Sequence, residues 1–186
     1  MVQIKMVEYD SRWTHEFDSL ASDLASCLGA TALRIDHIGS TAVDGLAAKD
    51  IIDIQVTVSD TGDAKIEKKL IEAGYVFRSD IQFDKLTGYS SESCELRKKY
   101  FREKPGSRIS HIHVRQHGRV NQEYPILFRD FLRNNSNVMR AYAEVKKELA
   151  SRFGDDREAY YSIKDPYMDT IYEAAKLWSL HNDWRL

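Results

Sequence analysis

The sequence contains little of what small disulfide-rich or zinc-ribbon domains are built from. Its 186 residues include two cysteines, Cys27 and Cys94, and three prolines. Two isolated cysteines give neither a disulfide framework nor the spacing of a structural zinc site. No run approaches the roughly 18 apolar residues of a membrane span, and the stretch from Met1 to Asp10 lacks the apolar centre of a signal peptide. We therefore expect a cytoplasmic protein without a membrane partner.

The chain also lacks a strong net charge. Its 27 basic and 29 acidic residues give a formal charge of −2, so nothing attracts nucleic acid or anionic lipid to the molecule as a whole. Affinity for phosphate must come from a local patch, and we favour a nucleotide or other phosphorylated small molecule over nucleic acid as the partner. With 42% hydrophobic residues the chain can form a proper core. We expect one domain over residues 1–186; the sequence does not fix the oligomeric state.

Amphipathic patterns predict most of the secondary structure. Apolar residues recur at helical spacing after Trp13 until Gly29, and a second helix covers 62–73. A basic strand at 96–104 turns at Pro105-Gly106 into a strand at 108–115. Helices follow at 124–133, 136–153 and 156–164, and Asp165-Pro166 is expected to open the last one.

The stretch from 37 to 58, HIGSTAVDGLAAKDIIDIQVTV, changes character three times. A strand-like approach ends at Gly39-Ser40, a helical turn is predicted from about Thr41 to Lys49, and a β-branched run follows from Ile51 to Val58. This last run carries Asp53, and an ionised carboxylate on a half-buried strand is costly unless it is paired or coordinates a metal. Asp53 is therefore the first candidate functional residue.

The turn at Gly39, Ser40 and Thr41 is a candidate phosphate site. Unpaired backbone N–H groups and the positive end of a helix dipole attract a phosphate oxygen at such a corner. An ordinary helix N-cap at Ser40 or Thr41 is the alternative. Lys49 is either a phosphate contact or a solvated lysine, and the pattern favours neither. The stretch is not a P-loop, because no Lys-Ser/Thr pair follows the second glycine.

Three histidines are candidates for chemistry. His111 and His113 stand two apart on a predicted strand, so their rings share one face. They could form half of a metal site, or a general base with its orienting partner. His37 shares a strand face with Leu33 and Ile35, which favours a core role, and it remains a secondary metal candidate.

These segments resemble two nested families. Ile38-Gly39-Ser40 followed by Asp53-Ile54-Gln55 is similar to the nucleotidyltransferase superfamily, in which a Gly-Ser turn precedes a strand with two metal-binding acids. More closely, nearly the whole chain resembles the GrpB family. The similar segments are IGSTAV, GLAAK, IIDI, the strand from His111 to Val114, Leu127 to Asp130, and Asp155 to Tyr160 with Lys164.

The resemblance implies an α/β (α+β) fold, with a nucleotidyltransferase-like mixed sheet over about 30–116, flanking helices, and a C-terminal helical bundle over about 122–182. It also implies Mg²⁺ at the positions of Asp53 and Gln55, with Mn²⁺ or Zn²⁺ as alternatives. Gln55 departs from the superfamily, because an amide offers magnesium only a neutral carbonyl. A second carboxylate would have to come from elsewhere, and the candidates are Asp36, Asp84 and Glu95.

Basic residues outside this stretch are further phosphate candidates. Arg102 lies in the basic strand, which suits a nucleotide groove and, almost as well, the protection of a sheet edge. Arg129 and Lys164 match the GrpB family and could reach a phosphate over the cleft. Surface ion pairing is the commoner role of such side chains.

Three functions remain open. The first is a metal-dependent nucleotidyltransferase acting on a nucleotide and a small acceptor, with Asp53 holding the metal and His111 or His113 as base. The second is a non-catalytic nucleotide- or partner-binding module, since GrpB-like domains also occur attached to dephospho-CoA kinases. The third is a transition-metal-dependent hydrolase or metal-binding protein that also uses His37. If no second carboxylate stands within coordination range of Asp53, the first function is disfavoured relative to the second. Histidines converging on Asp53 would favour the third.

Overall fold

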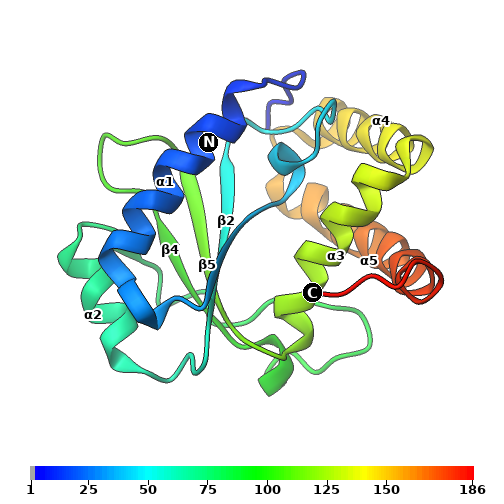
Figure 1. Cartoon of the computed structure of the whole chain (residues 1–186). Coiled ribbons are helices and arrows are strands. Elements are labelled where there is room, and N and C mark those ends of the chain that lie inside the picture. The colour runs from blue at the N-terminus through cyan, green and yellow to red at the C-terminus, as the bar shows by residue number, and fades with distance from the viewer. Residues whose placement is uncertain (1–2) are drawn as a thin grey trace.

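A computed structural model describes residues 3–186 and shows a mixed β-sheet between two groups of helices (Figure 1). Within these residues five strands form the sheet in the order β1-β2-β5-β4-β3. The central pair β2 and β5 is parallel, and the other pairs are antiparallel. The strands are β1 (Arg34–Ile38), β2 (Ile52–Val58), β3 (Val76–Phe77), β4 (Lys98–Arg102) and β5 (Ser110–Gln116). This confirms the mixed α/β fold expected from the sequence.

The two faces of the sheet differ in polarity because side chains alternate along each strand. On β2, Ile52, Ile54 and Val56 are fully buried and pack against α1 (Arg12–Leu28) and α2 (Ala64–Glu72). Asp53 and Gln55 point to the opposite face, toward the C-terminal helices. One face thus supplies the main hydrophobic core, and the other carries polar groups that need partners.

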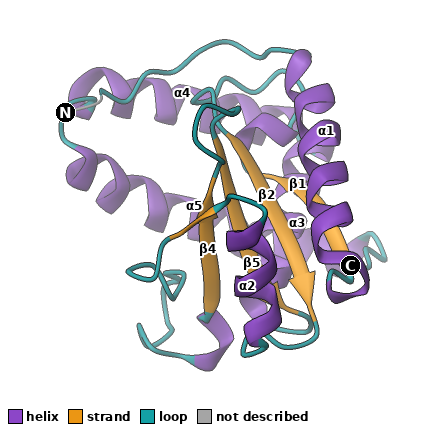
Figure 2. Ribbon diagram, turned by 90° about the vertical axis from the view of Figure 1, so that its left-hand side faces the viewer, coloured by secondary structure: helices purple, strands orange, loops and turns teal. Residues whose placement is uncertain are grey.

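Three helices form the second half of the molecule, α3 (Val120–Asn134), α4 (Ser136–Phe153) and α5 (Arg157–His181). They enclose a second apolar cluster that includes Leu127, Tyr142 and Tyr172. Figure 2 views the sheet from the side of α1 and α2, which lie in front of it. None of the described helices has the length and apolarity needed to cross a membrane.

Two predicted helix boundaries were wrong. No new helix starts at Asp165-Pro166, because α5 runs through Pro166 without a break. A proline costs a helix one backbone hydrogen bond, and the packing of Tyr167 and Ile171 into the second apolar cluster holds the helix together beyond it. The helical turn predicted from Thr41 to Lys49 is only a short 3₁₀ turn, Ser40–Ala42. Gly45, with φ of 77°, cannot continue a right-handed helix.

The basic strand is not at the edge of the sheet, so edge protection does not explain its charge. β4 lies between β5 and the two-residue strand β3. Its cations are matched locally, since Lys98 pairs with Asp84, Lys99 with Glu67 and Arg102 with Glu103. The positive charge seen in the sequence is therefore largely neutralised in the fold.

Candidate functional site

A cavity of about 410 Å³ lies between the polar face of the sheet and the C-terminal helices. Its wall combines the Gly39-Ser40 corner, the polar ends of β2 and β5, and side chains of α3, α4 and α5. Of the sequence candidates, the lining contains Gly39, Ser40, Thr41, Lys49, Asp53, His111, His113 and Lys164.

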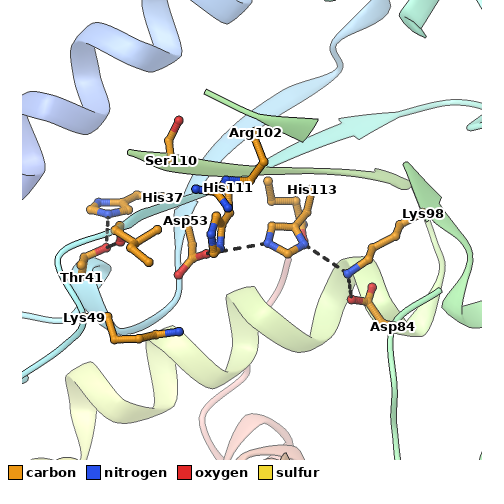
Figure 3. Close-up of polar contacts among 12 residues, drawn as sticks. His37, Thr41, Lys49, Asp53, Asp84, Lys98, Arg102, Ser110, His111 and His113 are labelled. Atoms are coloured by element: carbon orange, nitrogen blue, oxygen red, sulfur yellow. Dashed lines mark hydrogen bonds and ion pairs between the residues drawn. The ribbon is translucent and has the colours of Figure 1, made fainter. Parts of the chain in front are cut away.

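Asp53, His111 and His113 meet in this cavity (Figure 3). The parallel register places Asp53 opposite His111 and Gln55 opposite His113. His111 Nδ1 lies 3.1 Å from Asp53 Oδ1, and His113 Nε2 lies 3.8 Å from the same oxygen. Burial alone would raise the pKa of Asp53, but its contacts with the two imidazoles outweigh this and hold the pKa below its usual value. Asp53 is therefore an ionised carboxylate.

The surroundings of His113 fix which ring nitrogen carries its proton. Nδ1 lies 3.4 Å from Lys98 Nζ and 3.3 Å from Arg115 Nη2. Arg115 stays charged at any physiological pH and can only donate, so Nδ1 accepts and the ring proton sits on Nε2, facing Asp53. Burial, followed by the charges of Arg115 and Lys98, lowers the pKa of His113 to about 3. His113 is therefore a neutral imidazole whose Nε2–H faces Asp53 at 3.8 Å, beyond hydrogen-bond distance.

Gln55 and the candidate second carboxylates do not join this group. Gln55 is fully buried, accepts from Arg115 Nη1 at 2.7 Å and donates to the carbonyl of Gln122 at 2.8 Å. Asp84 lines the cavity but is bound by Lys98 and Arg115. Asp36 pairs with Arg34, and Glu95 pairs with Arg119. Among residues 3–186, the group around Asp53 that could hold a metal ion contains one carboxylate.

The donor set suits a divalent ion, and His113 is the poorest of its three ligands. Asp53, His111 and His113 each offer an atom within 4.8 Å of the others, so a His/Asp site of the right composition exists. A ligating histidine normally donates its second N–H to an acceptor. His113 faces two donors there, whereas His111 Nδ1 lies 3.1 Å from the Asp53 carboxylate, which can only accept, so the proton of His111 sits on Nδ1 and Nε2 keeps its lone pair. Asp53 and His111 are therefore the better ligands.

The Gly39-Ser40 corner sits directly against Asp53. Gly39 has φ of 71°, and a Cβ at this position would lie 2.6 Å from Asp53 Oδ2. Glycine is required here both by the backbone conformation and by this close approach. The predicted corner and the predicted carboxylate are thus in contact.

Lys146 on α4 is a site residue that the sequence analysis missed. It is 2% exposed and lines the cavity, with Nζ 2.8 Å from Ser40 Oγ and 2.6 Å from the carbonyl of Ala47. Neither partner is charged. Burial, followed by the nearby Lys164 and Lys49, lowers its pKa to about 6. Its helical spacing from Tyr142 and Leu149, inside the apolar stripe of α4, was the one signal that it points inward.

Two further lysines face the same end of the cavity. Lys49 donates to the hydroxyl of Tyr161 on α5, and Lys164 lies 3.5 Å from Asp165. Both line the cavity with Lys146. Lys49 and Lys164 also lie over the ring of Tyr161, 4.9 and 5.7 Å from its centroid, and their charges lower the pKa of Lys146. Three lysines from three segments thus share this part of the cavity.

His37, Arg102 and Arg129 lie outside the cavity lining. His37 is buried, bonds Thr41 Oγ1 at 3.0 Å and stacks on Phe17 with ring centroids 4.6 Å apart. Burial lowers its pKa to about 4, as expected for a neutral core histidine. Arg129 donates to the carbonyl of His37, and Arg102 pairs with Glu103. The structure gives these three side chains local partners instead of a place at the site.

Comparison with known sequences points to one family. A family model described as GrpB protein matches residues 3–174. The UPF0157 protein YqkA of Bacillus subtilis is 33% identical over 95% of this chain and 48% of its own length. A dephospho-CoA kinase of Mycobacterium tuberculosis is 33% identical over 97% of this chain and again 48% of its own length. The chain therefore spans about half the length of both curated relatives.

Comparison with solved structures agrees. The conserved protein GrpB from Enterococcus faecalis matches with a TM-score of 0.75 and 30% identity, covering 94% of this chain and 99% of that one. A crystal structure of the Cid1 poly(U) polymerase matches with a TM-score of 0.50 and 13% identity, covering 78% of this chain and 43% of that one. At this identity the likeness concerns the fold alone, and it supports the nucleotidyltransferase-like architecture.

Proposed function

The chain belongs to the GrpB protein family, and from this premise we propose that its cavity binds a nucleotide or another phosphorylated small molecule beside a single divalent metal ion. The reaction class that we favour is hydrolysis or transfer at phosphorus assisted by that one ion. A binding module without catalysis is the second candidate, because Gln55 stands where the superfamily has its second acid and is engaged by Arg115.

The observation that carries the proposal is Lys146. A buried ammonium group without a carboxylate partner is costly, and the other charges close to it are the lysines 49, 147 and 164. An anionic ligand would compensate all the cavity-facing members of this cluster at once. Phosphate oxygens also suit the hydroxyl of Ser40, which lies beside Lys146.

The metal half of the proposal rests on Asp53 and His111. Imidazole and carboxylate ligands favour Zn²⁺ or Mn²⁺, while Mg²⁺ prefers an all-oxygen site. A bound ion would supply positive charge next to the phosphate oxygens. His113, with its proton on Nε2, would donate a hydrogen bond to the ligand. With one carboxylate in the group, this arrangement supports two-ion nucleotidyl transfer less well.

The test is a titration of tripolyphosphate and ATP into the protein and into Lys146→Met, followed by calorimetry. We expect the variant to lose at least tenfold in affinity for both ligands, because its cavity has lost the buried amine whose charged form a bound anion would stabilise. Lys147→Met is the matched control, since Lys147 is the next residue on α4 and pairs with Glu8 at the surface. Equal affinities in the protein and in Lys146→Met would refute the anion site.

The metal is tested in the same titrations with Mg²⁺, Mn²⁺, Zn²⁺ or a chelator. We expect an ion to strengthen ATP binding in the protein but not in Asp53→Asn. His111→Ala should weaken the effect more than His113→Ala, as the tautomer of His113 requires. An unchanged effect of the ion in Asp53→Asn would remove Asp53 from the metal site and leave the anion site standing.

A further inference from the structure

One part of the cavity, the aromatic compartment, has a mainly aromatic and aliphatic wall. One face of α3 contributes Asn121, Tyr124 and Phe128, which follow at helical spacing. The rings of Tyr124 and Phe128 lie nearly parallel, 6° apart in plane and 5.9 Å between centroids. Leu86 and Met168 also line the cavity and pack against the same apolar cluster, and Met168 Sδ lies 2.7 Å from Lys164 Nζ, so this wall adjoins the lysine cluster. Such a compartment suits a flat apolar ring.

Asn121 is the polar group in this wall that lacks one of its partners. Its Nδ2 donates to Asp84 Oδ2 at 3.0 Å and to the carbonyl of Arg97 at 3.1 Å. These two acceptors fix the orientation of the amide, because a flipped side chain would turn its oxygen toward both of them. Oδ1 is buried without a partner in the described part of the chain, and Asn121 is 3% exposed.

A buried acceptor without a donor is uncommon in folded proteins and calls for an explanation. Folding alone explains only the Nδ2 half of Asn121, which ties α3 to Asp84 and to the residue before β4. The other polar atom, Oδ1, belongs to a residue in the wall of the aromatic compartment and has no hydrogen-bond partner among residues 3–186. A ring N–H or exocyclic amine would supply the missing donor.

We propose that Asn121 is a specificity-determining residue whose Oδ1 accepts a hydrogen bond from an N–H group of a nucleobase-type ring in the aromatic compartment. The inference rests on the proposed function, in which the phosphates of the same molecule lie at the lysine cluster. Because Oδ1 is covered in the structure described here, the contact forms as the neighbouring wall adjusts around the ring. The donor that both kinds of ligand offer is an N–H group on a heteroaromatic base, either in an exocyclic amine or in a ring imide.

The test compares ligands that differ in this one donor. ATP is paired with purine riboside triphosphate, which lacks the exocyclic amine, and UTP with N3-methyl-UTP, which lacks the imide N–H. Tripolyphosphate reports the phosphate end alone. We expect one pair to differ at least tenfold in affinity in favour of the donor, and that pair identifies the type of N–H.

Asn121→Leu supplies the second measurement. It should abolish the difference within that pair and leave tripolyphosphate binding unchanged, which a purely structural role would not produce. If neither pair differs in the unmodified protein, the inference is overturned, even if the variant does not fold. If tripolyphosphate and the nucleotides all fail to bind, the proposed function fails and this inference with it.

Discussion

At the scale of single residues, the site is unusual in burying a lysine in its wall without an anion to match the charged form of its amine. Lys146 has only the Ser40 hydroxyl and the Ala47 carbonyl as hydrogen-bond partners. Asp84, by contrast, is held by both Lys98 and Arg115. Two cations are thus neutralised at one end of the cavity, and the lysine cluster is left for a ligand at the other.

The Lys146 assignment predicts a pH-dependent stability. The pKa is about 6 in the folded protein against an ordinary value of 10.5, so between these values the unfolded chain binds one proton more. The free energy of unfolding should therefore rise with pH across this window, by at most about 1.4 kcal/mol per unit. This contribution is absent in Lys146→Met.

Urea unfolding of the ligand-free protein and of both lysine variants at pH 6, 7.5 and 9 measures this effect. We expect the unmodified protein to gain stability relative to Lys146→Met as the pH rises, and to keep a constant difference from Lys147→Met. A constant difference from Lys146→Met would mean that Lys146 is charged in the fold throughout this range.

At the scale of elements, local patterns predicted the sheet better than the helices. The alternation around Asp53 and around His111 was enough to put these side chains on one face of β2 and of β5, because alternation is a property of the strand itself. The continuity of α5 through Pro166 depends on packing against other helices, which no local pattern reports. Lys146 and Asn121 were missed for a related reason, since polar side chains on amphipathic helices are usually exposed.

The corner between β1 and the Ser40–Ala42 turn gives a prediction at this scale. Gly39→Ala should be more destabilising than Gly118→Ala. Both glycines have positive φ, at 71° and 79°, but a Cβ at 118 meets nothing within 4 Å. The shared backbone cost is about 1 kcal/mol, and displacing the Asp53 carboxylate should add roughly 1–3 kcal/mol.

Urea unfolding measures both variants, and metal titration provides a second readout. Gly39→Ala should also weaken the effect of the ion on ATP binding, because Asp53 must move. Equal destabilisation in the two variants would show that the Asp53 side chain can move aside without loss of stability. The Gly39-Ser40 corner would then not be what positions Asp53.

At the scale of the whole molecule, the cavity lies between two halves with separate apolar clusters. The sheet provides Asp53 and His111, while α4 and α5 provide Lys146 and Lys164. Hydrogen bonds that connect the two halves directly include Lys146 to Ser40 and Lys49 to Tyr161. A ligand that engages both sides should act as an additional link between the halves.

We therefore expect a bound nucleotide to protect both halves at once in hydrogen exchange. At a hundred times its Kd, a ligand stabilises the fold by about 2.7 kcal/mol, which corresponds to a rise in Tm of roughly 5–11 °C for a chain of this size. Amide protection should increase together in the 39–49 segment, in α4 around Lys146 and in the first half of α5. The exchange of α2, which packs on the far face of the sheet, reports only the global stabilisation and serves as the internal control. Extra protection confined to one half would mean that the ligand contacts that half alone, and that the cavity does not work as a single site.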